Sequence, residues 1–158
     1  CGLAVADVPP RMASPLAPLP ASWAGDGWQV DLLERGAAQW RQGGSDRLGG
    51  YALEGRRLEL QPPEGPPLRL TLLADGRLRT EAGALLARLQ PAAPFEPRLV
   101  LAGWFTYVAD APRIVLCADG RALPVQQAGD YLALERAYTA ARPGPGAPLW
   151  VQLDARIA

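Results

Sequence analysis

Two cysteines, Cys1 and Cys117, are the side chains of this sequence that could carry covalent chemistry. A thiol acts as a nucleophile or a metal ligand once it is deprotonated, and a neighbouring histidine often activates it. The sequence contains no histidine. Catalytic Ser–His–Asp and Cys–His arrangements are therefore excluded, and two cysteines without histidine cannot complete a structural zinc site.

Carboxylates are the remaining residues that could do chemistry, as an acid–base pair or as ligands of a hard metal ion. No stretch has the spacing of a calcium-binding loop. The 16 acidic residues balance 16 basic ones, so no excess of positive charge favours nucleic acid. We therefore expect no catalytic residues, no metal site, no nucleic-acid partner and no enzymatic activity.

Cys1 begins a proline-rich segment, residues 1–22, in which only Asp7 and Arg11 are charged. Proline fixes φ and lacks an N–H donor, so this segment is predicted to be neither a helix nor an interior strand. In an extended polyproline conformation, at about 3.1 Å per residue, it would reach about 60 Å. The segment is therefore predicted to be a tether.

A cysteine at the head of such a tether resembles the start of a mature bacterial lipoprotein, from which a signal peptide has been removed. In that family the cysteine carries acyl chains such as palmitate, and stable anchoring takes two or more chains. The resemblance implies a covalent lipid on Cys1 as the only cofactor. Gly2, where an aspartate would favour the inner membrane, implies the periplasmic face of the outer membrane. The alternative is a chain end left by proteolysis or cloning, with a free thiol.

Residues 23–92 read as short strands separated by turns. Leu68, Leu70 and Leu72 alternate with polar residues ahead of an Asp-Gly pair at 75–76. Alternation followed by Asp-Gly is a strong hairpin signal, because both residues tolerate positive φ. Two more strands are predicted around Gly50–Leu53 and Arg57–Gln61. This half is therefore predicted to be a β module, and its sequence indicates no function.

Residues 96–158, after a proline-rich joint, predict a second β module. A long apolar run over 98–108 suits a buried strand, and a hairpin turns at 119–120. Asp130 is a candidate N-cap for a helix near 130–142, whose apolar stripe comprises Tyr131, Leu134, Tyr138 and Ala141. A final strand follows from residue 149. This order is typical of an OB-type fold, and an ordinary small α+β sheet is the alternative. The chain as a whole is predicted to be mainly β, a β-rich α+β protein of two small modules.

Residues 103–157 resemble the C-terminal, OB-like domain of the NlpE lipoproteins and related short lipoproteins. The matching stretches are FTYVADA (105–111), IVLC (114–117), GDYLALERAYTAAR (129–142) and PLWVQLDARI (148–157). That family is associated with surface sensing and envelope-stress signalling. Its N-terminal C-x-x-C pair is absent here, and so is the C-terminal partner of its second-domain cysteine. The resemblance therefore predicts an unpaired thiol at Cys117, buried as a small apolar side chain or, alternatively, reactive.

Four aromatic residues of the second module, Trp104, Phe105, Tyr107 and Trp150, are candidates for a binding platform, since OB folds bind ligands in this way. Core packing is expected for at least two of them. An exposed tryptophan would mark a protein-binding hot spot. Trp104, Tyr107 and Trp150 are therefore the candidate partner contacts.

Together these features predict a non-enzymatic outer-membrane lipoprotein that acts as a periplasmic interaction or envelope-stress-sensing module. It would bind the membrane through its lipid and a protein of the cell envelope through its second module, and no small-molecule substrate is indicated. An accessory structural subunit of a larger envelope complex is the main alternative. A lipoprotein inhibitor of a hydrolase such as lysozyme is a third possibility.

Overall fold

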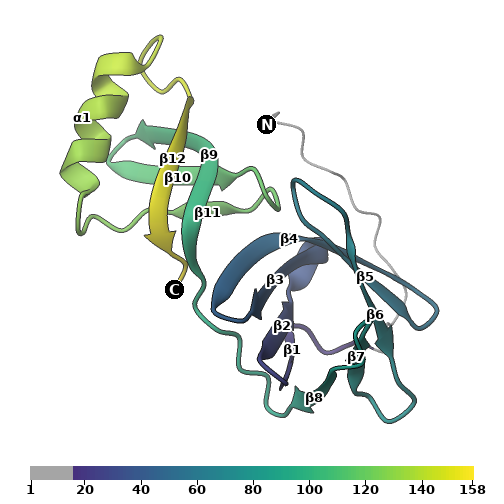
Figure 1. The fold of residues 1–158 in the computed structure, drawn as a ribbon. Helices are drawn as coiled ribbons and strands as arrows, with labels where there is room; N and C mark the ends of the chain where they lie inside the picture. The colour runs from purple at the N-terminus through teal and green to yellow at the C-terminus, as the bar shows by residue number, and fades with distance from the viewer. Residues whose placement is uncertain (1–15) are drawn as a thin grey trace. The chain divides into compact units, whose positions relative to one another are not determined.

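The computed structural model describes residues 16–158, which form two compact units (Figure 1). The first unit comprises residues 16–99 and 155–158, and the second comprises residues 100–154. Strands dominate both units, and one α-helix lies in the second. The prediction of a mainly β protein with one helix is confirmed.

The first unit is a closed barrel of eight antiparallel strands. Each strand pairs with the next along the chain, and β1 closes the barrel by pairing with β8. Closure leaves no unpaired sheet edge. The strands are β1 (Ala21–Gly25), β2 (Trp28–Leu32), β3 (Ala37–Gln42), β4 (Ser45–Glu54), β5 (Arg57–Gln61), β6 (Leu68–Leu72), β7 (Leu78–Thr80) and β8 (Leu85–Leu89). A short 3-10 turn, η1 (Glu34–Gly36), joins β2 to β3.

Apolar side chains fill the interior of this barrel. Trp23 and Trp40 are completely buried. Because side chains alternate across a strand, every second residue points inward. The other fully or nearly fully buried members of this core are Leu16, Ala21, Val30, Leu32, Ala38, Leu58, Leu60, Leu70, Leu78 and Leu86. The barrel is thus a packed core.

Close packing also explains one glycine within a strand. A Cβ atom on Gly49 would overlap the carbonyl oxygen of Gln61 and lie 2.9 Å from Cη2 of Trp40. Only a residue without a side chain allows β4 to approach β5 and the buried indole this closely.

Leu16 lies ahead of β1 and belongs to the barrel core, with 2% of its surface exposed. The sequence predicted a tether through residue 22, and this boundary is wrong, since β1 already begins at Ala21. Proline in this stretch prevents a helix but does not prevent an apolar side chain from packing against the barrel. The rest of the predicted tether, residues 1–15, lies outside the described residues.

The proline-rich joint after β8 is held against the outside of the barrel. The buried Asp31 carboxylate accepts hydrogen bonds from the Gln39 amide (2.8 Å) and from the backbone N–H of Phe95 (2.9 Å). The Gln39 amide also donates to the carbonyl of Phe95 (2.6 Å), and the Gln29 amide donates to that of Ala93 (2.8 Å). These contacts fix residues 93–95 on β2 and β3.

A second set of contacts continues this attachment. The Arg41 guanidinium lies 4.4 Å from the centre of the Phe95 ring and forms a bidentate ion pair with Asp46, at 2.6 and 2.9 Å. Asp46 also accepts a hydrogen bond from the backbone N–H of Arg98 (2.9 Å). We call these two sets together the joint clamp: Gln29, Asp31, Gln39, Arg41 and Asp46.

In the second unit the strands form a four-stranded sheet in the order β11-β10-β9-β12, and a helix precedes the last strand (Figure 1). The elements are β9 (Arg98–Val108), β10 (Ala111–Leu116), β11 (Ala122–Pro124), α1 (Tyr131–Ala141) and β12 (Leu149–Arg156). The predicted order of three strands, a helix and a strand is confirmed. Among the described residues, the first unit is a closed barrel and the second is a four-stranded sheet. No local sequence pattern predicts the closure of the first unit.

Helix α1 packs on one face of this sheet. The rings of Phe105 and Tyr138 meet edge to face, with centroids 5.2 Å apart, and the Tyr138 hydroxyl donates to the carbonyl of Ala147 (2.7 Å). Tyr131 completes the buried cluster. Asp130 precedes the helix as predicted, but its side chain makes no capping hydrogen bond. No helix within residues 16–158 combines the length and the apolar character needed to cross a bilayer.

Candidate functional site

The aromatic residues proposed as partner contacts divide between the two faces of the second sheet. Phe105 is completely buried against α1, and Tyr107 packs against the same cluster. Because side chains alternate along β9, Trp104 points to the opposite face. The structure therefore does not bring Trp104 and Tyr107 together in one platform.

Tyr107 is part of the hairpin between β9 and β10. Its hydroxyl donates to Oδ1 of Asp110 (2.7 Å), in a turn where Ala109 and Asp110 both have positive φ. This hydrogen bond, followed by desolvation, raises the pKa of Tyr107 to about 12. Both causes favour the neutral phenol. The hydroxyl thus has an internal partner, which makes Tyr107 a weaker candidate for contact with another protein.

Trp150 lies on the same face as Trp104. Its neighbours Leu149 and Val151 pack against the Phe105 cluster, so Trp150 points away from α1. Strands β9 and β12 are adjacent, and Trp150 is 45% exposed. Two more apolar residues of β9 share this face and are exposed, Val100 and Val108. We call these four residues the tryptophan face: Val100, Trp104, Val108 and Trp150.

The tryptophan face has the character expected of a protein-binding surface. Apolar side chains that gather on one exposed surface often mark interaction sites, whereas single exposed apolar residues are ordinary. The indole N–H of Trp104 is buried and has no hydrogen-bond partner within residues 16–158.

The prediction of a free thiol at Cys117 is wrong in this structure, because Cys117 is disulfide-bonded. Its backbone N–H donates to the carbonyl of Ala102 (2.9 Å), which fixes the residue directly after β10. The predicted lipidation site, Cys1, lies outside the described residues. Among residues 16–158, no three histidine, cysteine, aspartate or glutamate side chains come close enough together to hold a metal ion.

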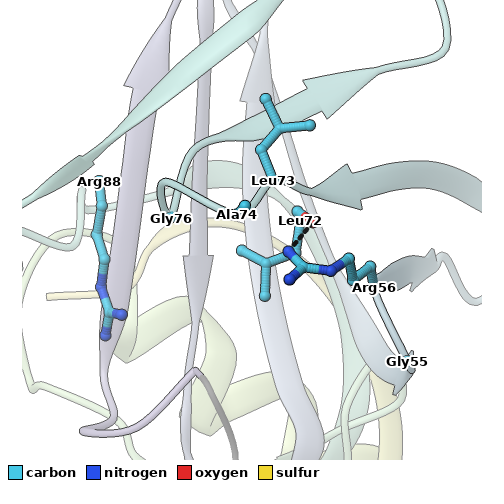
Figure 2. A pocket seen from close by; sticks show the side chains of 7 residues that line it. All are labelled: Gly55, Arg56, Leu72, Leu73, Ala74, Gly76 and Arg88. Atoms are coloured by element: carbon cyan, nitrogen blue, oxygen red, sulfur yellow. Dashed lines mark hydrogen bonds between the residues drawn. The ribbon is translucent and has the colours of Figure 1, made fainter.

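A pocket at one end of the barrel was not predicted from the sequence. It has a volume of about 400 Å³ and lies between the β4–β5 and β6–β7 turns (Figure 2). Its lining residues are Gly55, Arg56, Leu72, Leu73, Ala74, Gly76 and Arg88. We call it the arginine pocket. These turns reach the same end because consecutive antiparallel strands alternate in direction, and the chain segment before β1 reaches it too.

Arg88, on β8, is fixed by contacts with this segment. Its Nη2 donates to the carbonyls of Leu16 (3.0 Å) and Ala17 (3.3 Å), and its guanidinium lies 5.2 Å from the centre of the Trp23 ring. The Trp23 indole N–H in turn donates to the carbonyl of Gly76 (2.8 Å). The wall of the pocket is thus connected to the barrel core.

Arg56 lies on the other side of the pocket, in the β4–β5 turn (Figure 2). It is exposed, and its Nη1 makes one long hydrogen bond, 3.4 Å, to the carbonyl of Leu72. The sequence predicts both hairpin turns. It does not predict that they lie side by side, because that arrangement results from the closure of the barrel.

Comparisons with known proteins find a match for residues 96–158. Residues 96–158 match the family model described as the NlpE C-terminal OB domain. Among solved structures, the chain is similar to the Cpx pathway activator NlpE from Escherichia coli, with 22% sequence identity and a TM-score of 0.36. That match covers 82% of this chain and 75% of the NlpE chain. The curated proteins include no match. The predicted resemblance to the NlpE C-terminal domain is therefore confirmed.

Proposed function

We propose that this protein is a lipoprotein of the bacterial outer membrane that works as a non-enzymatic interaction or stress-sensing module in the periplasm. The observation that carries the proposal is the match of residues 96–158 to the NlpE C-terminal OB domain. The similar solved structure is described as an activator of the Cpx pathway. By analogy, we propose a role in envelope-stress signalling for this chain.

The tryptophan face supports contact with a protein in the cell envelope. Its exposed members include Val100, with 65% of its surface accessible, and Trp150, with 45%. Tryptophan in an apolar surround is enriched among the residues that contribute most to protein binding. The proposal involves no catalytic step, no metal, no nucleic acid and no cofactor besides the lipid.

Cys1 is the proposed attachment site of the lipid, because a proline-rich stretch follows it directly. An acyl group linked through the Cys1 sulfur would leave that atom unable to form a disulfide, so a Cys1 that carries lipid on its sulfur cannot be the partner of the disulfide-bonded Cys117. The mass of the native protein, measured with and without reductant, therefore also reports which bond this sulfur makes.

A stress reporter tests the sensing role. Overproduction of the wild-type protein should activate an envelope-stress reporter, and Trp150→Ala should reduce this activation several-fold because it removes the largest exposed apolar contact. Gln152→Ala is the matched control, since Gln152 is exposed on the same side of β12. A reporter that responds equally to all three proteins, or to none, would contradict the sensing role.

The second candidate function, an accessory subunit of an envelope complex, is favoured by the same exposed tryptophan. Affinity purification in mild detergent distinguishes a subunit of a complex from a sensor. A subunit should co-purify with its partners in a fixed ratio that Trp150→Ala lowers, whereas a sensor should elute without a stoichiometric partner at rest.

A further inference from the structure

We propose that the arginine pocket binds a phosphate group, carried either by a soluble metabolite or by a lipid headgroup. This site lies in the first unit and is independent of the function proposed for the second. The argument rests on the charge, the shape and the rigidity of the pocket.

Within residues 16–158, neither arginine of the pocket has an acidic partner. Within residues 16–158 their hydrogen-bond acceptors are backbone carbonyls alone: Leu72 for Arg56, and Leu16 and Ala17 for Arg88. A guanidinium carries five N–H donors, so each arginine keeps donors for a ligand. Arginine is the residue best suited to bind phosphate, because its planar fork matches two oxygens at once.

The carboxylates next to the lining residues do not cancel this charge. Asp75 forms an ion pair with Arg77, with Oδ2 and Nε 2.7 Å apart, and also accepts the Arg77 backbone N–H. Glu54 directly precedes the β4–β5 turn that carries Arg56, and Arg57 directly follows this turn. Arginines therefore outnumber carboxylates around the pocket although the whole chain is neutral.

The shape of the pocket suits a small molecule. Its volume of about 400 Å³ falls within the usual range of ligand sites. Leu72, Leu73 and Ala74 lie between the two arginines, which stand on opposite sides (Figure 2). A Cβ atom on Gly55 or Gly76 would meet no atom within 4 Å, so the space above both turns is open.

The side of the pocket that carries Arg88 is also held rigidly. Trp23 is completely buried, and its indole N–H fixes the carbonyl of Gly76 while its ring supports the Arg88 guanidinium. A site that is fixed before binding loses less conformational entropy when a ligand enters. Arg88 in particular is positioned before any ligand arrives.

Calorimetric titration and vesicle flotation test the proposal on the full chain. The soluble probes are inorganic phosphate and glycerol 3-phosphate. The lipid probes are vesicles of phosphatidylcholine with and without phosphatidylglycerol, used with the Cys1→Ala variant so that no acyl chain contributes. We expect binding to at least one phosphate probe, weakened about tenfold by Arg56→Gln, because a charge-assisted hydrogen bond is lost.

Arg47→Gln is the matched control, because Arg47 is exposed near the β3–β4 turn, at the opposite end of the barrel. Arg88→Gln also removes the bonds to Leu16 and Ala17 and is expected to lower stability, so the exposed Arg56 is the deciding position. Binding of a soluble probe identifies a metabolite, and binding only to phosphatidylglycerol vesicles identifies a lipid headgroup. The proposal is overturned if no probe binds, or if Arg47→Gln weakens binding as much as Arg56→Gln does.

Discussion

Replacing Asp31 by alanine should release the proline-rich joint from the barrel. The Asp31 side chain is completely buried and accepts hydrogen bonds from the Gln39 amide (2.8 Å), the Gln29 amide (3.2 Å) and the Phe95 backbone N–H (2.9 Å). Its removal leaves the partly buried Phe95 N–H without an acceptor, and about 1–3 kcal/mol, the cost of a fully buried unpaired donor, is the upper limit for this loss.

The expected total effect is larger than one lost hydrogen bond. Bonds to a charged acceptor contribute about 1.5–3 kcal/mol each, but the Gln39 amide keeps its bond to the Phe95 carbonyl (2.6 Å). We therefore expect the free energy of unfolding to fall by about 2–4 kcal/mol in Asp31→Ala. Asp31→Asn keeps the shape of the side chain and one acceptor oxygen, so its free energy of unfolding should fall by less than that of Asp31→Ala.

Urea unfolding, followed by tryptophan fluorescence, measures this change because Trp23 and Trp40 are buried in the barrel. Hydrogen exchange at the Phe95 amide reports the joint itself and should become much faster in Asp31→Ala. Gln42→Ala is the control, since Gln42 is exposed at the end of β3 and its side chain is not part of the joint clamp. Unchanged exchange at Phe95, together with a stability within about 0.5 kcal/mol of the wild type, would refute the clamp.

Three further predictions concern single groups. Tyr138→Phe removes the hydroxyl that donates to the carbonyl of Ala147 (2.7 Å). In urea unfolding, this change should lower the free energy of unfolding by about 1 kcal/mol. A loss above that of Tyr138→Ala would contradict this explanation. The raised pKa of Tyr107, about 12, means that its contribution to stability is complete below pH 10 and is lost as the pH rises from 10 to 12. Ultraviolet titration should show one tyrosine ionising near pH 12, moving toward 10 in Asp110→Asn, and an unmoved transition would refute the assigned cause. Gly49→Ala should destabilise the barrel by more than about 2 kcal/mol in thermal unfolding, because the added Cβ has no room, and a neutral effect would show that β4 and β5 can separate.

Local sequence patterns predict the strands, turns and helix well, because each of these depends mainly on residues close to it in the sequence. Asp75 and Gly76 form the predicted turn, and Tyr131 and Tyr138 form the buried stripe of the predicted helix. Alternation also placed Phe105 and Trp104 on opposite faces, as the structure shows. Such features need no knowledge of the rest of the chain.

Features that depend on distant residues could not be predicted in this way. Barrel closure requires β1 to pair with β8, and nothing near Ser22 indicates Leu89 as its partner. The arginine pocket follows from closure and was missed for the same reason. The prolines around Leu16 predict a tether there, whereas the packing of Leu16 against the barrel depends on strands that are distant in the sequence. The disulfide at Cys117 is not predicted from the sequence, because the family's partner cysteine is absent and Cys1 is expected to carry the lipid.

Intact mass spectrometry of the protein purified from native envelopes tests the central proposal most directly. The account predicts a mass that exceeds the mass of the amino-acid chain by two or three acyl chains, and the excess should disappear in Cys1→Ala. An unmodified mass for the membrane-derived protein would contradict the lipid anchor and, with it, the proposed place of this protein at the outer membrane.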